Sequence, residues 1–269
     1  RHAPPATTAG MLPHVLPVRW RALSAQRGGQ FLAAIACFEL AIALAPDSAE
    51  ACAALGNAYR VKAQYGFGTM AECHPLGRAA LMRALELDPE NAEATGYLAI
   101  YKLNEEVQDP SEALALFERA LALDPRLSEI RGLYAGWGLA IAGQGALDER
   151  AEREVRRSLA DDPLNVICST IFAIVLGGLG QAAEGAAEAK RACERDPAAF
   201  GPRYALAWTQ TWARQTEAGL ATVNDAMEQF GRHPWFLQVL TGLLVQRGDR
   251  TRAEAVHAEL EARAISGGM

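Results

Sequence analysis

One proline-bounded segment recurs along this chain and constrains its fold more than any other feature. Its clearest copy is ALFERALALDPRLS at 115–128, where an apolar-periodic stretch stops at Asp124-Pro125. Proline cannot continue a helix interior, so each copy marks a boundary between helices. A period in the mid-thirties with purely helical patterning is typical of stacked helix pairs. The boundary prolines, spaced by 43, 36, 38, 34 and 37 residues, are Pro46, Pro89, Pro125, Pro163, Pro197 and Pro234.

Composition supports a helical fold and limits the partners. Half of the residues are apolar and 7% are aromatic, which favours tightly packed helices over a sheet-built core. The formal net charge of −6 argues against a broad surface for nucleic acid or anionic lipid, because both need clustered cations. No apolar run approaches the ~20 residues of a membrane-spanning helix. The five cysteines are scattered and odd in number, which fits a reducing compartment, so we expect a cytoplasmic protein.

The repeat spacing predicts about seven helix pairs in an all-α fold. We expect a single solenoid domain over 14–264, between a flexible tail at 1–13 and a frayed tail at 265–269. Within the second pair, we expect a long connection at 65–75. The predicted pairs are 14–27 with 30–44, 48–63 with 75–87, 91–105 with 110–123, 127–142 with 148–161, 165–179 with 182–195, 200–214 with 217–230, and 235–247 with 250–264.

The positions before each boundary proline follow a fixed pattern. The second helix of the third pair carries Ala113, Phe117 and Ala120 ahead of Pro125, and the first pair shows the same order. First helices place a large residue beside a small one, as in Leu55-Gly56. In these residues the chain resembles the tetratricopeptide repeat (TPR) over roughly residues 14–264. The resemblance implies a right-handed α-α superhelix, a TPR solenoid, that binds other proteins.

A second resemblance covers the order of features along the chain. These features are YGFG in the 65–75 connection, then ELDPENAEA, DDPLN and HPWFLQVLTGLLVQRGDRTRAEAV. Their order is similar to the C-terminal repeat region of bacterial multidomain signalling and transcription-regulatory proteins. Those proteins carry a winged-helix, nucleotide-cyclase or kinase domain upstream. The resemblance implies that this chain is the partner-sensing half of such a protein and that an effector domain precedes Arg1.

The first helix of each pair is expected to line the concave side of the solenoid, where partners bind. Tyr204, Trp208 and Trp212 recur at i, i+4 and i+8 and form an aromatic ridge on one helix face. Rigid amphipathic rings of this kind are typical of binding hot spots. We predict a groove that holds an extended peptide or a helix; the alternative is that the rings fill gaps between irregularly spaced repeats. The predicted lining residues are Asn57, Trp137, Ile174, Tyr204, Trp208, Thr211, Trp212, Trp235 and Gln238.

No set of residues at a spacing that supports catalysis or metal binding emerges from the sequence. The five histidines are dispersed, and Asp161-Asp162 falls at a junction between helices. Gly66-Phe67-Gly68 lacks the strand and the Lys-Ser/Thr of a phosphate loop. We therefore predict a non-catalytic scaffold for a protein or peptide partner, without cofactor, metal, nucleic acid or membrane. Three alternatives stay open: a sensor of a small ligand in the aromatic pocket, an enzyme, and self-association through an open end such as Val15–Leu23.

Overall fold

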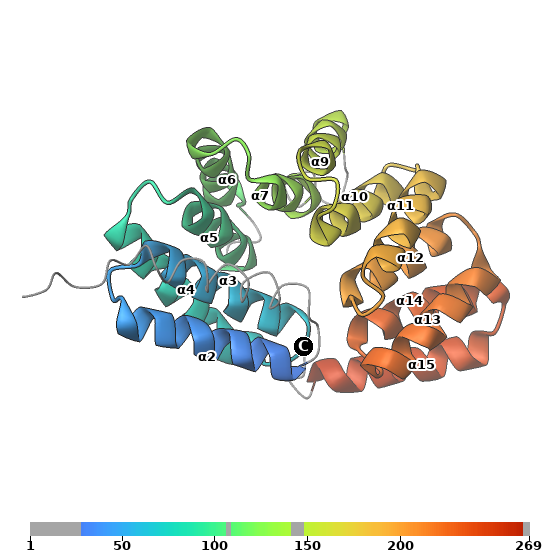
Figure 1. Cartoon of the computed structure of the whole chain (residues 1–269). Coiled ribbons are helices and arrows are strands. Elements are labelled where there is room, and N and C mark those ends of the chain that lie inside the picture. The colour runs from blue at the N-terminus through green and yellow to red at the C-terminus, as the bar shows by residue number, and fades with distance from the viewer. Residues whose placement is uncertain (1–27, 106–108, 141–147, 266–269) are drawn as a thin grey trace, which may run out of the picture. The chain divides into compact units, whose positions relative to one another are not determined.

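A computed structural model of the chain describes residues 28–105, 109–140 and 148–265. Across these residues, helices alternate with short turns and no strand is present, as the sequence predicts (Figure 1). The chain divides into two compact units, Arg1–Leu98 and Ala99–Met269. The helix predicted at 14–27 lies outside the described residues, and the single domain over 14–264 stays a prediction.

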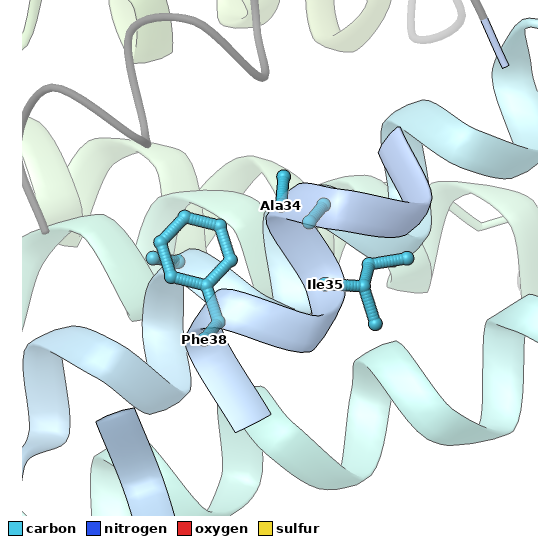
Figure 2. Packing of buried hydrophobic residues seen from close by; sticks show 5 residues of the cluster. Ala34, Ile35 and Phe38 are labelled. Atoms are coloured by element: carbon cyan, nitrogen blue, oxygen red, sulfur yellow. The ribbon is translucent and has the colours of Figure 1, made fainter. Parts of the chain in front are cut away.

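The first unit contains α2 (Gly28–Leu44), α3 (Ala49–Gln64) and α4 (Met70–Leu87), and α5 (Ala92–Glu105) begins in it. Phe38 of α2 is 2% exposed and packs with Ala34 and Ile35 against the small residues Ala54 and Ala58 of α3. Figure 2 shows this cluster from close by. The alanines leave room for the phenylalanine ring, so the Ala-x-x-x-Phe spacing becomes the contact between two helices.

The second helix of the second pair begins earlier than the sequence predicted. The structure places its first residue at Met70, so the predicted range 75–87 and the long connection at 65–75 were wrong. A capping box starts the helix: the Thr69 hydroxyl accepts the Glu72 N–H at 3.2 Å, and the Glu72 carboxylate accepts the Thr69 N–H at 3.2 Å. Pro75 then lies inside α4, where it removes one backbone hydrogen bond without ending the helix.

The second unit stacks helices in the order expected of repeated pairs. Each helix packs on the next along the chain, and the first helices α7, α10, α12 and α14 also pack on one another in that order. Every helix therefore contacts near neighbours in sequence, as stacked repeats require. Its elements are α6 (Ser111–Leu123), α7 (Ser128–Leu133), η2 (Tyr134–Leu139), α9 (Glu149–Asp161), α10 (Val166–Gly178), α11 (Ala182–Arg195), α12 (Phe200–Trp212), α13 (Thr216–Phe230), α14 (Pro234–Arg247) and α15 (Arg250–Ile265).

The first helix of the fourth pair is not the regular helix that was predicted for 127–142. It runs as an α-helix to Leu133 and as a π-helix over Tyr134–Leu139, and residues 141–147 lie outside the described part. Gly136 faces α10 so closely that a Cβ there would lie 2.8 Å from Ile171 Cγ2. Apolar periodicity reports which face is buried, and it does not distinguish an α turn from a wider π turn.

The boundary prolines lie where they were predicted. Pro46, Pro89, Pro125, Pro163 and Pro197 each occupy a short turn between two helices. Aspartates support several of these turns: Asp88, Asp124 and Asp196 each accept the N–H two residues further on, at 3.0 to 3.1 Å. Pro234 differs, because it is the first residue of α14, a position that tolerates proline.

Candidate functional site

The aromatic ridge predicted from the sequence exists on α12. Tyr204 and Trp208 meet edge to face with ring centroids 6.3 Å apart, and Trp208 and Trp212 stack with centroids 5.0 Å apart and planes 13° apart. The Trp212 side chain is 40% exposed, and the other two are partly buried. The three rings thus form one continuous apolar surface along about two turns of the helix.

A glycine on the neighbouring first helix fixes the position of Trp212. A Cβ added at Gly177 of α10 would lie 2.3 Å from Trp212 Cε3 and 2.5 Å from Cζ3. Only a residue without a side chain lets the indole rest against the α10 backbone. Trp212 is therefore held between α10 and the Trp208 ring, while the rest of the indole remains open to solvent.

Tyr204 and Trp208 also share a hydrogen bond. The Trp208 indole N–H donates to the Tyr204 hydroxyl oxygen. Burial raises the pKa of the Tyr204 hydroxyl above its usual value, and the bond from Trp208 opposes that shift. The phenol therefore stays neutral through the physiological pH range, and this pair presents ring surface and no charge.

Trp235 extends the aromatic surface from α12 to α14. Its ring lies 4.8 Å from the Tyr204 ring, centroid to centroid, and 5.9 Å from Phe200. His233 places it, because the His233 Nδ1 accepts the Trp235 N–H at 3.2 Å and so caps α14. Burial, with a smaller effect of Arg263, lowers the pKa of His233 to about 4, so the ring is neutral and able to accept this bond near pH 7.

Ile174 and Gln238 lie on α10 and α14, the two first helices that flank α12. Ile174 of α10 is partly buried and packs against a small cluster formed by Ala173, Ala189 and Ala205. Gln238 is exposed on α14, one turn beyond Trp235. Further along the same helix, a Cβ on Gly242 would lie 3.8 Å from the methyl group of Thr211.

Two predicted lining residues do not join this surface, and a third, Asn57, belongs to the other unit. Thr211 is 5% exposed, and its hydroxyl donates to the Ala207 carbonyl at 2.8 Å. The prediction that Thr211 lines the surface was therefore wrong. Asn57 lies in the first unit, is 2% exposed, and accepts the Arg60 Nε–H at 2.8 Å. Trp137 is partly exposed on η2, and among the described residues no ring contact joins it to the ridge.

Sequence reasoning missed the residues that hold the rings in place. Gly177, Phe200 and His233 were given no role at the site. The signal for Gly177 was a glycine pair inside an apolar helix, where glycine otherwise costs about 1 kcal/mol. Phe200 is 4% exposed and contacts Tyr204, His233 and Trp235, so it is the buried support of the cluster.

The described residues offer no site for metal chemistry. No group of three or more His, Cys, Asp or Glu side chains that could hold a metal ion occurs among them. Within the same part of the chain, no helix is both long and apolar enough to cross a membrane. The arrangement on α10, α12 and α14 is suited to binding through apolar contact.

Comparison with known proteins gives structural neighbours and no sequence relative. No family model matches the sequence, and no curated protein matches it. The human IFIT1 dimer with m7Gppp-AAAA is similar with a TM-score of 0.63 and 18% identity, over 79% of this chain and 50% of that one. This chain thus spans about half the length of the IFIT1 chain that it matches.

Two bacterial structures match over most of their own length. A tetratricopeptide repeat protein from Parabacteroides merdae has a TM-score of 0.56 at 13% identity, covering 95% of this chain and 92% of that one. A thermophilic TPR protein from Thermus thermophilus has a TM-score of 0.58 at 19% identity, covering 73% and 100%. The chain therefore has the fold of the tetratricopeptide-repeat proteins, as its proline-bounded repeats predicted.

Proposed function

We propose that this chain is a non-catalytic protein-interaction module that binds a segment of its partner over the aromatic surface of α12 and α14. The observation that supports the proposal is the exposure of Trp212, which is 40% open although it stacks on Trp208. Trp208, which stacks on Trp212, and Trp235, which contacts Tyr204, are also partly open. Large rings that share one exposed surface are typical of binding hot spots, because they bury much area and lose little side-chain entropy.

The packing alternative explains part of the same geometry. Trp212 contacts α10 at Gly177, and Trp235 of α14 contacts Tyr204, so the rings do fill the spaces between neighbouring repeats. If the ring served packing alone, full burial would be favoured, because each Å² of apolar ring surface that is buried stabilises the fold by about 25 cal/mol. The exposed part of the ring is the part that a partner would cover.

A phosphate-rich ligand fits this surface poorly. The matching IFIT1 structure was determined with m7Gppp-AAAA, a ligand that carries several phosphates. Binding of nucleic acid depends on clustered lysine and arginine side chains. On α10, α12 and α14 the charged residues are Arg203 and Arg247 alone, and both have partners within the protein. A protein partner is therefore the better match to the chemistry of this surface.

The resemblance to bacterial signalling proteins suggests a setting for this binding. In a cytoplasmic signalling or transcription-regulatory protein, a module of this kind would recruit or sense the partner, and another domain would produce the output. This setting rests on the sequence resemblance, and the binding proposal does not depend on it.

The proposal is tested by binding with a matched pair of variants. The chain would be used to capture proteins from its own cells, and each captured protein would be purified and titrated against wild type, Trp212→Ala and Leu164→Ala. Leu164 is 71% exposed in a turn of the same unit, so it controls for the loss of an exposed apolar side chain. We expect Trp212→Ala to weaken binding by roughly 30-fold, the equivalent of about 2 kcal/mol, and Leu164→Ala to leave it unchanged.

Folding of each variant would be verified by circular dichroism before titration. If every purified partner binds wild type and Trp212→Ala with equal affinity, the aromatic surface is not the binding site and the proposal fails.

A further inference from the structure

We infer that the partner segment on this surface is an amphipathic α-helix that presents an uncharged, apolar stripe. The inference rests on the function proposed above and adds the chemistry of the partner. It concerns the neutral face, which we define as Ile174, Tyr204, Trp208, Trp212, Trp235 and Gln238 on α10, α12 and α14.

The three first helices that carry the neutral face are almost free of charge. α10 contains no charged residue, α12 contains Arg203, and α14 contains Arg247 at its last position. The second helix α11, which packs between α10 and α12, contains six, namely Glu184, Glu188, Lys190, Arg191, Glu194 and Arg195. Across α10, α11, α12 and α14, most charged residues therefore lie on the second helix α11 and few lie on the first helices.

The two arginines of these helices are directed elsewhere. The Arg203 guanidinium donates to the Pro197 carbonyl at 3.1 Å, in the turn before α12. Its charge also acts on Cys193 of α11, where it partly opposes the burial that raises the pKa of that thiol to about 11. Arg247 pairs with Asp249 at 3.1 Å in the turn after α14. Neither cation belongs to the neutral face.

This distribution selects against a charged partner segment. A carboxylate or ammonium group pressed against the rings would lose its hydration and would find no opposite charge to compensate. An apolar, uncharged stripe loses no such hydration and gains the area that it covers. The face therefore favours neutral apolar side chains.

The supply of hydrogen-bond acceptors selects a helix over an extended peptide. An extended segment brings one N–H and one C=O per residue, and most of these groups must be paired when buried. Among the six residues, the polar groups are the Gln238 amide, the Tyr204 hydroxyl, which already accepts from Trp208, and the three indole N–H groups, so the face offers few partners for a row of backbone groups. A helix pairs its own backbone groups and needs only apolar contact.

The dimensions of the face match two turns of a helix. Trp235 of α14 contacts Tyr204 of α12, and Gly242 lies beside Thr211, so the two first helices run side by side with Gln238 next to the middle of the ridge. Tyr204 to Trp212 spans eight residues, about 12 Å along the axis. Anchors at i, i+3 or i+4, and i+7 on a partner helix cover about 10.5 Å, which is close to this length.

The test uses displayed peptides of about 16 residues in two formats, lactam-bridged helices and proline-interrupted chains that cannot form a helix. In both formats, the positions of the stripe are varied over apolar, acidic and basic residues. Selection on wild type is followed by titration of the enriched peptides against Gln238→Glu and Gln238→Lys. Gln238 is exposed, so both variants are expected to fold, which a thermal melt would verify. Gln229→Glu and Gln229→Lys place the same charges on the exposed surface of α13 as matched controls.

We expect lactam-bridged peptides with uncharged stripes to be enriched. Both Gln238 variants should weaken their binding by about tenfold, whichever sign is introduced, and the Gln229 variants should leave it within about twofold. Enrichment of charged stripes, strengthening by one of the two Gln238 charges, or enrichment of the proline-interrupted format would overturn the inference. In those cases, continued loss of binding in Trp212→Ala would leave the proposed function standing. If no peptide is enriched, the inference fails. If the enriched peptides bind Trp212→Ala as tightly as wild type, both the inference and the proposed function are refuted.

Discussion

Replacing Gly177 with alanine has two opposing effects on stability: alanine has the higher helix propensity, but its Cβ collides with the Trp212 ring. The new Cβ would lie 2.3 Å from Trp212 Cε3, 2.5 Å from Cζ3 and 3.2 Å from Thr209 Cγ2. The last contact can relax by a few tenths of an ångström, but the first two cannot be accommodated without moving the ring. Since Trp212 is at the end of α12 and partly exposed, its indole can swing outward and lose its contact with α10 and part of its stack on Trp208.

The magnitude follows from the area that the ring has covered. A tryptophan buries up to about 250 Å², and Trp212 keeps 60% of that covered because 40% is exposed. At about 25 cal/mol per Å², complete loss would cost about 4 kcal/mol and loss of half about 2 kcal/mol. Weaker stacking adds roughly 0.5 to 1 kcal/mol, and alanine returns up to about 1 kcal/mol through helix propensity. We expect Gly177→Ala to lower the free energy of unfolding by about 1 to 2 kcal/mol.

Urea unfolding measures this loss, and a second background identifies its cause. In Trp212→Ala the ring is absent, so Gly177→Ala should then raise the free energy of unfolding by up to about 1 kcal/mol. The sign of the effect is expected to reverse between the two backgrounds. Gly178→Ala is the matched control, because Gly178 is an exposed glycine at the end of the same helix. It should be neutral or slightly stabilising in both backgrounds.

Two results would refute this reasoning. If Gly177→Ala destabilises equally with and without the Trp212 ring, the cost comes from another contact, such as Thr209. If it stabilises the wild-type background, the ring does not rest on α10 in solution. Near-ultraviolet circular dichroism of the stacked Trp208 and Trp212 pair gives an independent measure, since a displaced ring should reduce that signal.

Three further predictions concern pH and packing. The folded pKa of His233, about 4, lies below the ordinary 6.5, so the unfolded chain binds the proton first as the pH falls. The stability that neutral His233 contributes is therefore complete above pH 6.5 and is lost as pH falls toward 4. His233→Asn, which keeps a capping side chain, should flatten the pH dependence of unfolding in that window. Phe38→Ala should cost about 3 to 5 kcal/mol and speed amide exchange in α2, while Leu40→Ala, at a 59% exposed position, should change stability by less than about 0.5 kcal/mol. Gly56→Ala should lower the melting temperature, because its Cβ would lie 2.5 Å from Leu81 Cγ and overpacking costs about 1 to 3 kcal/mol.

The pairing of helices could be predicted from sequence because local chemistry repeats at each boundary. A proline that cannot continue a helix follows an aspartate that closes the turn, and small residues recur where helices meet. These signals act over a few residues, so they survive without knowledge of the rest of the fold. The late start predicted for α4 shows their limit: the predicted range began at Pro75, whereas the capping box at Thr69 and Glu72 determines where the helix begins.

The candidate site was predicted less completely, because a helical sequence pattern indicates which way a side chain points around the helix axis but not how deeply it is buried. Thr211 and Trp212 are adjacent in sequence and were both assigned to the surface, yet one is 5% and the other 40% exposed. Successive residues point about 100° apart on a helix, so an error of one position exchanges a buried residue for an exposed one. The role of Gly177 depends on a residue 35 positions away, and no local pattern contains that information.

Gly177 also allows the packing and binding roles of Trp212 to be separated. Many domains have a free energy of unfolding of 5 to 15 kcal/mol, so a loss of about 1 to 2 kcal/mol leaves nearly every molecule folded. Any loss of affinity in Gly177→Ala would then report the displaced ring and not an unfolded fraction. If Trp212 serves packing alone, this variant should melt earlier and bind its partner as wild type does. If Trp212 is a binding anchor, affinity should fall even at a temperature where the variant is fully folded, because the indole no longer lies where the partner meets it.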